Sequence, residues 1–213
     1  MAISNYSELQ TAVSDWLHDD ILTPKVPDFI TLGEVTLNRR LRLMQQEEVA
    51  TINTSITDRF GALPSDFLEL IDLALYSDGY PQTLTQITLA KINENATNIY
   101  AMPRFYAVSS NIIFDVISDE VYPCQLRYYK KLDIEADTTN FVLTNYPDLY
   151  LYSALLASAP YIENDARIST WASLLDSAIA STIKADGRSR GKTMLVADAG
   201  LLMRSKTDIF TGV

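Results

Sequence analysis

The stretch PDLYLYSALLASA, residues 147–159, carries no charge after its second residue, and it decides the fold. Its spacing predicts a helix, because Leu151 and Leu155 share one face while Tyr152 and Leu156 share another. A helix that is apolar on every side has to be covered on every side. Two arrangements stay open, namely a central core helix and a helix that neighbouring subunits cover. The side chains expected to pack in the core or between subunits are Tyr150, Tyr152, Ala154, Leu155 and Ala157.

Three further helices are predicted from apolar residues that recur every three and four positions. The first follows a capping-box-like pair, Asn5 and Glu8, and ends near His18. The second begins at Pro27, and the last runs from Asn164-Asp165 to Asp186-Gly187, since glycine is common just past a helix end. The residues expected to face the core are Leu9, Ala12, Val13, Trp16 and Leu17 in the first helix, Ile30, Gly33, Leu37, Leu41 and Met44 in the second, and Ile168, Trp171, Leu175, Ala178, Ile179 and Thr182 in the last.

Between the second helix and residue 145 the pattern changes to the strand period of two. Residues 51–57 alternate in this way, the leucine-rich residues 68–75 predict another strand, residues 104–116 predict a hairpin, and residues 125–131 form a tyrosine-rich strand. The sequence therefore predicts an α+β fold, with a bundle of about four helices, an inserted small antiparallel β region and an extended C-terminal tail. The expected bounds are one domain over 1–187 (helical parts 1–46 and 145–187, β insertion 47–144) and a tail over 188–213.

Charge is distributed unevenly along the chain. The formal net charge is −10, and residues 184–213 hold six Lys and Arg against three Asp and Glu, so residues 1–183 carry −13. An acidic body repels nucleic-acid phosphates and argues against tight binding of DNA or RNA.

The single cysteine, Cys124, and single histidine, His18, exclude an intramolecular disulfide and a Cys/His zinc site within one chain. With neither a signal peptide nor a membrane span in the sequence, we expect an intracellular, cofactor-free protein.

Few residues suggest catalysis. Residues 187–193 resemble a phosphate loop, but three residues separate the glycines where the motif has four. His18 has no nucleophile that the sequence ties to it. The acidic pairs Asp19-Asp20, Glu47-Glu48 and Asp119-Glu120 leave a carboxylate-dependent hydrolase as an alternative. No catalytic, cofactor-binding or metal-binding residue is predicted.

Two basic segments are candidates for contacts with a partner. Arg39, Arg40 and Arg42 end the second helix, where they either bind a phosphate or partner or complement the helix dipole. The tail mixes cations with apolar groups, which suits a segment that docks into another protein. Its candidate binding residues are Arg188, Arg190, Lys192, Met194, Leu195, Leu201, Leu202, Met203, Arg204 and Lys206.

Several signatures together resemble the head-to-tail adaptor, or connector, proteins of short-tailed and related bacteriophages. The resemblance covers roughly residues 5–187 and consists of spaced apolar and aromatic residues rather than of a catalytic motif. Its signatures lie at residues 6–17, 29–42, 63–70, 104–106, 126–129, 141–156, 159–161 and 164–171.

The resemblance implies a structural virion protein, made in the host cytoplasm, that sits at the head–tail junction. Such proteins form a ring of twelve subunits beneath the portal protein, extend the channel for double-stranded DNA, and offer a platform to the downstream tail protein, a nozzle or tube. Their C-terminal segments grip the portal, which would place residues 188–213 on it. A tail-completion or tube subunit is the alternative position in the virion.

Overall fold

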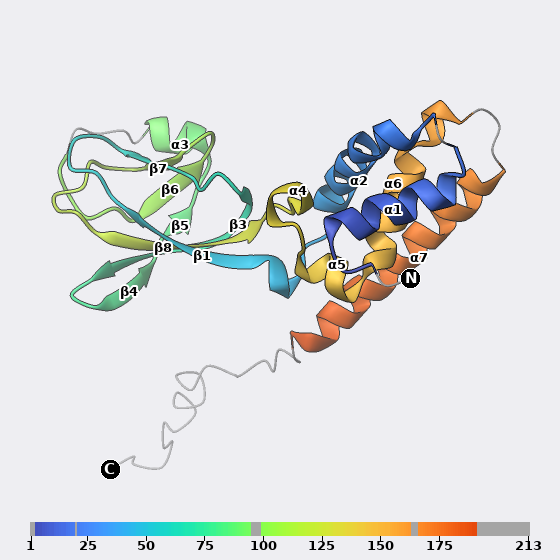
Figure 1. Cartoon of the computed structure of the whole chain (residues 1–213). Helices are drawn as coiled ribbons and strands as arrows, with labels where there is room; N and C mark the ends of the chain where they lie inside the picture. Colours follow the sequence, from blue (N-terminus) through green and yellow to red (C-terminus); the bar gives the residue numbers. More distant parts are fainter. Residues whose placement is uncertain (1–2, 20, 95–98, 163–165, 191–213) are drawn as a thin grey trace, which may run out of the picture.

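The computed structural model describes residues 3–19, 21–94, 99–162 and 166–190. Within these residues the fold is α+β, with seven α-helices and two four-stranded sheets. Figure 1 shows two bodies side by side. We call residues 3–46 together with 131–190 the helical body, and residues 47–130 the β body.

The helical body is organised around α6 (Pro147–Ala157), which contacts four other helices. These are α1 (Tyr6–Leu17), α2 (Val26–Arg40), α5 (Phe141–Asn145) and α7 (Arg167–Ser189). The short α4 (Ile134–Asp137) and the 3-10 turns Thr23–Lys25, Met44–Gln46 and Ala159–Tyr161 complete this body.

Helix α6 is covered almost entirely by its own chain. Leu149, Tyr150, Ala154 and Leu155 have no exposed surface, whereas Tyr152 and Ala157 are half-buried. This enclosure explains why the helix is apolar on every side, because other helices cover the face that an amphipathic helix would expose to water. The sequence left open whether this helix is a central core helix or is covered by neighbouring subunits, and this burial fits the core helix.

The closest approach within the helical body lies between α2 and α6. A Cβ atom on Gly33 would lie 2.8 Å from the backbone nitrogen of Ala154 and 2.8 Å from the carbonyl carbon of Ser153. Only a residue without a side chain fits there, so the two helices touch backbone to backbone.

Two buried polar residues of α2 connect the helical body to the chain that returns from the β body. The Asn38 amide donates to the Leu132 carbonyl at 3.0 Å and accepts from the Leu132 N–H at 2.8 Å. Glu34 accepts from the Ile134 N–H and from the Tyr150 hydroxyl, each at 2.8 Å. These bonds satisfy buried groups that would otherwise destabilise the fold.

The β body holds two sheets. Sheet A has the order β1-β8-β3-β4 and is antiparallel throughout, while sheet B has the order β2-β7-β6-β5 with β5 parallel to β6. The core between them includes Leu73, Leu126, Phe114 and Cys124, all buried. The elements are β1 (Glu47–Asn53), β2 (Phe60–Gly61), β3 (Phe67–Ser77), β4 (Tyr80–Thr83), β5 (Thr85–Gln86), α3 (Leu89–Glu94), β6 (Phe105–Val108), β7 (Ile112–Phe114) and β8 (Pro123–Lys130).

Many local expectations are confirmed. Asn5 caps α1 by accepting from the Glu8 N–H at 2.9 Å, and Glu8 reaches back to the Ser4 N–H at 2.7 Å. The hairpin at residues 104–116 is present as β6 and β7, and the turn after Ser77 joins β3 to β4. The apolar residues predicted for the last helix face the core, although its expected cap, Asn164-Asp165, lies outside the described residues.

Four expectations of detail differ from the structure, the first being that Trp16, expected to face the core, is 44% exposed. Helix α7 continues through Gly187 to Ser189, and α2 ends at Arg40, so Met44 lies in a separate 3-10 turn and is 39% exposed. Residues 132–143, expected in the β insertion, pack into the helical core through Leu132, Ile134, Val142 and Leu143. Contacts between residues that are distant in sequence set each of these boundaries.

We expect Gly33→Ala to lower the free energy of unfolding by about 1–3 kcal/mol, because the added methyl group forces α2 away from α6. Gly187→Ala is the matched control, since a Cβ atom there meets nothing within 4 Å and alanine favours a helix. The control should gain about 0.5–1 kcal/mol. Urea unfolding followed by circular dichroism measures both, and equal effects would contradict the close contact.

Candidate assembly surfaces

Helix α7 ends at the junction of the two bodies, where Arg190 holds it. The Arg190 guanidinium donates to Asp186 at 2.6 Å and to Glu47, the first residue of β1, at 2.7 Å. It also lies 6.0 Å from the centre of the Tyr129 ring on β8. Asp186 in turn accepts from the Met44 N–H at 2.8 Å. The bond to Asp186 raises the pKa of Arg190, so its guanidinium stays charged at all physiological pH values.

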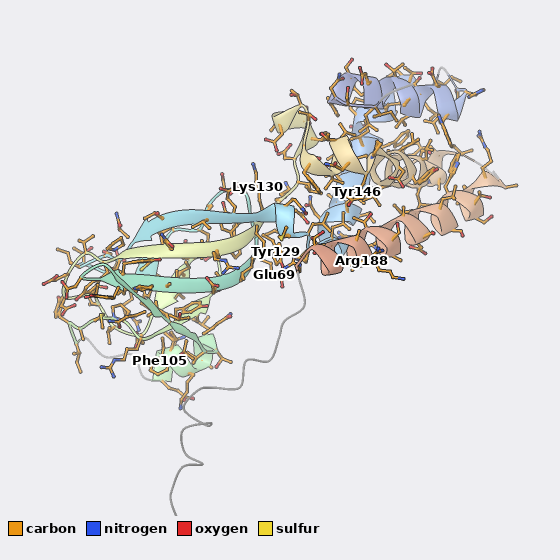
Figure 2. The ribbon with its side chains drawn as sticks, turned by 90° about the horizontal axis from the view of Figure 1, so that it is seen from below. Glu69, Phe105, Tyr129, Lys130, Tyr146 and Arg188 are labelled. Atoms are coloured by element: carbon orange, nitrogen blue, oxygen red, sulfur yellow. The ribbon has the colours of Figure 1, made fainter. Side chains whose placement is uncertain are left out.

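The expected tail residues thus divide into two groups. Arg188 and Arg190 belong to the end of α7 and its cap, which corrects the expectation of an extended chain from residue 188. Arg188 donates to the Lys184 carbonyl at 3.4 Å within α7, and Figure 2 shows it near the end of that helix. The rest of the predicted binding residues, Lys192, Met194, Leu195, Leu201, Leu202, Met203, Arg204 and Lys206, lie outside the described residues.

Two of the arginines at the end of α2 make ion pairs within the chain. Arg40 pairs with Asp176 of α7 at 2.7 Å, and Arg42 pairs with Glu69 of β3 at 2.6 Å. Arg42 also donates to the backbone carbonyls of Asn38 and Leu41. These side chains tie the helical body together and to sheet A, a role that the sequence did not reveal because their partners lie far along the chain.

Sheet A has one face turned away from sheet B, which we call the outer face. The strand registers place its side chains in cross-strand rows, because alternate residues of a strand point to the same side. The rows are Glu47–Tyr129–Glu69, Val49–Arg127–Asp72 and Thr51–Gln125–Ala74. The inner rows hold the buried residues Leu73, Leu75, Cys124, Leu126 and Tyr128.

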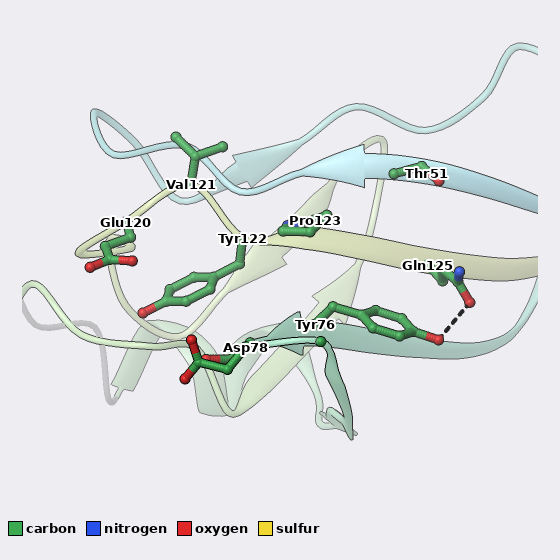
Figure 3. Close-up of a pocket in the computed structure, with 10 residues that line it drawn as sticks. Thr51, Tyr76, Asp78, Glu120, Val121, Tyr122, Pro123 and Gln125 are labelled. Atoms are coloured by element: carbon green, nitrogen blue, oxygen red, sulfur yellow. Dashed lines mark hydrogen bonds between the residues drawn. The ribbon is translucent and has the colours of Figure 1, made fainter.

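A depression of about 550 Å³ lies at the far end of the outer face, which we call the distal pocket (Figure 3). Its floor includes Tyr76, whose hydroxyl donates to Gln125 at 2.8 Å. Its rim carries Asp78 and Glu120, both exposed. Within the described part of the chain, neither of these two carboxylates makes an ion pair or a side-chain hydrogen bond. The lining residues are Thr51, Tyr76, Ser77, Asp78, Gly79, Glu120, Val121, Tyr122, Pro123 and Gln125.

Large apolar side chains are exposed on the outside of the helical body. Trp16 of α1 is 44% exposed, Leu32 of α2 is 53%, and Ile183 of α7 is 48%. Tyr161, next to α6, is 57% exposed. These exposed side chains are available for contacts with a partner, whereas the buried side chains of α6 are not.

The structure shows where the residues considered for catalysis lie and what they contact. Among the acidic pairs, Glu47 is bound by Arg190 and Arg127, and Asp119 accepts from the Tyr122 hydroxyl. His18 ends α1 in a left-handed conformation with φ 54°. The first glycine of the phosphate-loop-like segment lies inside α7, which excludes a loop there. The described residues contain no group of three or more His, Cys, Asp and Glu that could hold a metal ion.

One buried carboxylate has a shifted pKa. Burial raises the pKa of Glu34, although bonds from Tyr150 and Ile134 counteract the shift. The same burial, together with the Glu34 carboxylate, raises the pKa of Tyr150, and Asn140 donates to its hydroxyl at 2.7 Å. This cluster lies in the helical core and has Glu34 as its one carboxylate among these hydrogen-bonded side chains, so it does not offer the paired carboxylates that a hydrolase needs.

Comparison with known proteins identifies one family. The sequence model described as SU10 adaptor protein matches residues 4–197. No curated protein matches the chain. None of the helices in the described ranges has a long enough apolar run to cross a bilayer.

The buried position of Glu34 predicts a pH dependence of stability. Its pKa is raised in the folded state, so as pH rises the unfolded state loses the proton first and ionisation favours unfolding. The stabilisation is complete below the ordinary value of 4.5 and disappears as pH passes the raised value. We expect the wild type to lose stability relative to Glu34→Gln over this range, at about 1.4 kcal/mol per pH unit. Urea unfolding at several pH values measures the difference, and parallel curves would contradict it.

Proposed function

Since the chain belongs to the SU10 adaptor protein family and is a structural adaptor of a phage virion, we propose that a ring of its subunits joins the portal of the head to the tail. The family match carries this proposal, because it spans both bodies and the junction between them. The ring has twelve copies and the virion is of the short-tailed type, as in the adaptors that the sequence resembles.

The helical bodies form the contacts between subunits. The exposed apolar side chains Trp16, Leu32, Tyr161 and Ile183 support this assignment, since aromatic and aliphatic groups are typical of the buried centre of an interface. Helix α6 stiffens each subunit from within, because Tyr150, Ala154 and Leu155 are already covered by their own chain.

The C-terminal segment grips the portal protein. It begins at Arg190, which ion pairs fix at the junction of the bodies, so every subunit of a ring presents its segment from the same point. The cations and apolar residues of this segment suit a mixed protein surface. The downstream tail protein, a nozzle or tube subunit, binds at the opposite side of the ring.

The ring extends the channel through which double-stranded DNA passes. A net charge of −13 on residues 1–183 supports this role, because a like-charged wall lets the phosphate backbone slide without adhering. The protein is made in the host cytoplasm and ends at the head–tail junction, with no membrane contact and no cofactor.

Deleting residues 191–213 should abolish attachment to the portal protein while the unfolding curve stays unchanged, because Arg190 and its ion pairs remain. Co-purification of the full chain or the deletion with portal protein measures attachment. In the full-length control, Thr193, Asp198 and Thr207 change to serine, and this variant should attach normally. Changing Leu195, Leu201 and Leu202 to serine should weaken attachment at least about tenfold, equivalent to about 1.4 kcal/mol. Attachment by the deletion at wild-type strength would refute the role of the segment.

The number of subunits tests the position in the virion. Native mass spectrometry of the chain bound to portal protein should give twelve copies per complex. A complex with sixfold or threefold symmetry would instead indicate a tail-completion or tube subunit.

A further inference from the structure

The outer face of sheet A carries more acidic than basic groups. We call the row Glu47–Tyr129–Glu69 the proximal row and the row Val49–Arg127–Asp72 the middle row. Their three carboxylates pair with arginines: Glu47 with Arg190, Glu69 with Arg42, and Asp72 with Arg127. The distal pocket then adds Asp78 and Glu120, for which the described residues supply no cation. The face therefore ends in an uncompensated negative charge beside apolar and aromatic groups, including Val121 and Tyr76.

The chain leaves helix α7 at the opposite end of this same face. Arg190 bonds to Glu47 and lies over Tyr129, and both of these residues belong to the proximal row. Since residue 191 follows Arg190 directly, the segment 191–213 is joined to the described fold next to this end of the outer face.

The length and chemistry of the following residues match the face. An extended chain advances at most about 3.6 Å per residue, so four residues from Arg190 to Met194 reach about 14 Å. Thr51, four residues after Glu47 on β1, lies about 13 Å along the strand. Met194 stands at this limit, and Leu195 and Val196 extend the reach by about 7 Å more, which allows for the side-chain length between Arg190 and Glu47. This apolar group can therefore reach the distal pocket, with Lys192 before it and Arg204 and Lys206 after it.

We propose that residues 191–213 of the same chain dock along the outer face of sheet A, with their apolar group in the distal pocket and their cations beside Asp78 and Glu120. The docked segment covers the exposed apolar edge of the pocket and compensates its charge. This is an intramolecular contact of the free subunit.

The docking also controls when the segment can bind the portal protein. This consequence rests on the proposed function, whereas the docking itself does not. A segment held on sheet A is not free to bind elsewhere, so a subunit away from the portal keeps its own gripping residues covered. Portal binding then has to exceed the docking in affinity, which favours attachment where many portal sites lie close together.

The test uses the full chain with two introduced cysteines, Thr51→Cys and Met194→Cys. Native Cys124 does not interfere, because it is buried and burial raises the pKa of its thiol to about 12. In a glutathione redox buffer, docking should give an intramolecular disulfide, scored by mass spectrometry after mixing with isotope-labelled chain. The matched control pairs Met194→Cys with Ala180→Cys, which is exposed on α7 about 15 Å from Arg190.

Docking predicts several-fold more intramolecular disulfide with Thr51→Cys than with Ala180→Cys. Charge reversal at the pocket, Asp78→Lys with Glu120→Lys, should remove that excess, whereas Asp15→Lys with Glu135→Lys on the helical body should preserve it. Equal disulfide yields in the two cysteine pairs, or disulfides that join two chains, would overturn the proposal.

Portal co-purification of the disulfide-locked chain separates the two proposals. The lock holds the segment up to residue 194, so the locked chain should attach at least several-fold more weakly than the reduced chain. Equal attachment of the locked and the reduced chain would overturn the control of portal binding and leave the docking intact. A pair that never locks would overturn the docking and leave the portal role intact.

Discussion

The backbone contact between α2 and α6 at Gly33 is the constraint on which the rest of the subunit depends. Because no side chain separates the helices there, Tyr150 reaches Glu34 and becomes buried with its hydroxyl bonded. Glu34 and Asn38, held by the same helix, then fix the backbone at Ile134 and Leu132. One helix contact thereby sets where the chain returns from the β body.

A second set of contacts joins the bodies from the other side. Arg42 binds Glu69, and Arg190 binds Glu47, so the ends of α2 and α7 both meet sheet A. Exposed ion pairs each contribute little to stability, but here several share partners in a network. Their role is positional, since they fix the point from which residues 191–213 leave the described fold.

The candidate site shows where local reasoning from sequence fails. Gly187 is a typical residue to end a helix, yet α7 continues to Ser189, because Asp186 and Arg190 bind groups of the 3-10 turn Met44–Gln46 and of β1 and hold the last turn. The arginines of α2 likewise gave no signal of their partners, which lie more than a hundred residues away in the case of Arg40 and Asp176. Local propensity describes the residue and its neighbours, whereas these outcomes depend on tertiary contacts.

The sequence alone determined the periodic elements, the cap of α1, the α+β class and the need to cover the apolar stretch at residues 147–159. Period and capping are local properties, so a single sequence carries them. Only the tertiary structure decided that the cover comes from α1, α2, α5 and α7 of the same chain, and that residues 132–143 join the helical core. The physical reason is that burial depends on contacts between residues distant in sequence, and no residue near Gly33 in the sequence indicates that Ser153 and Ala154 lie against it.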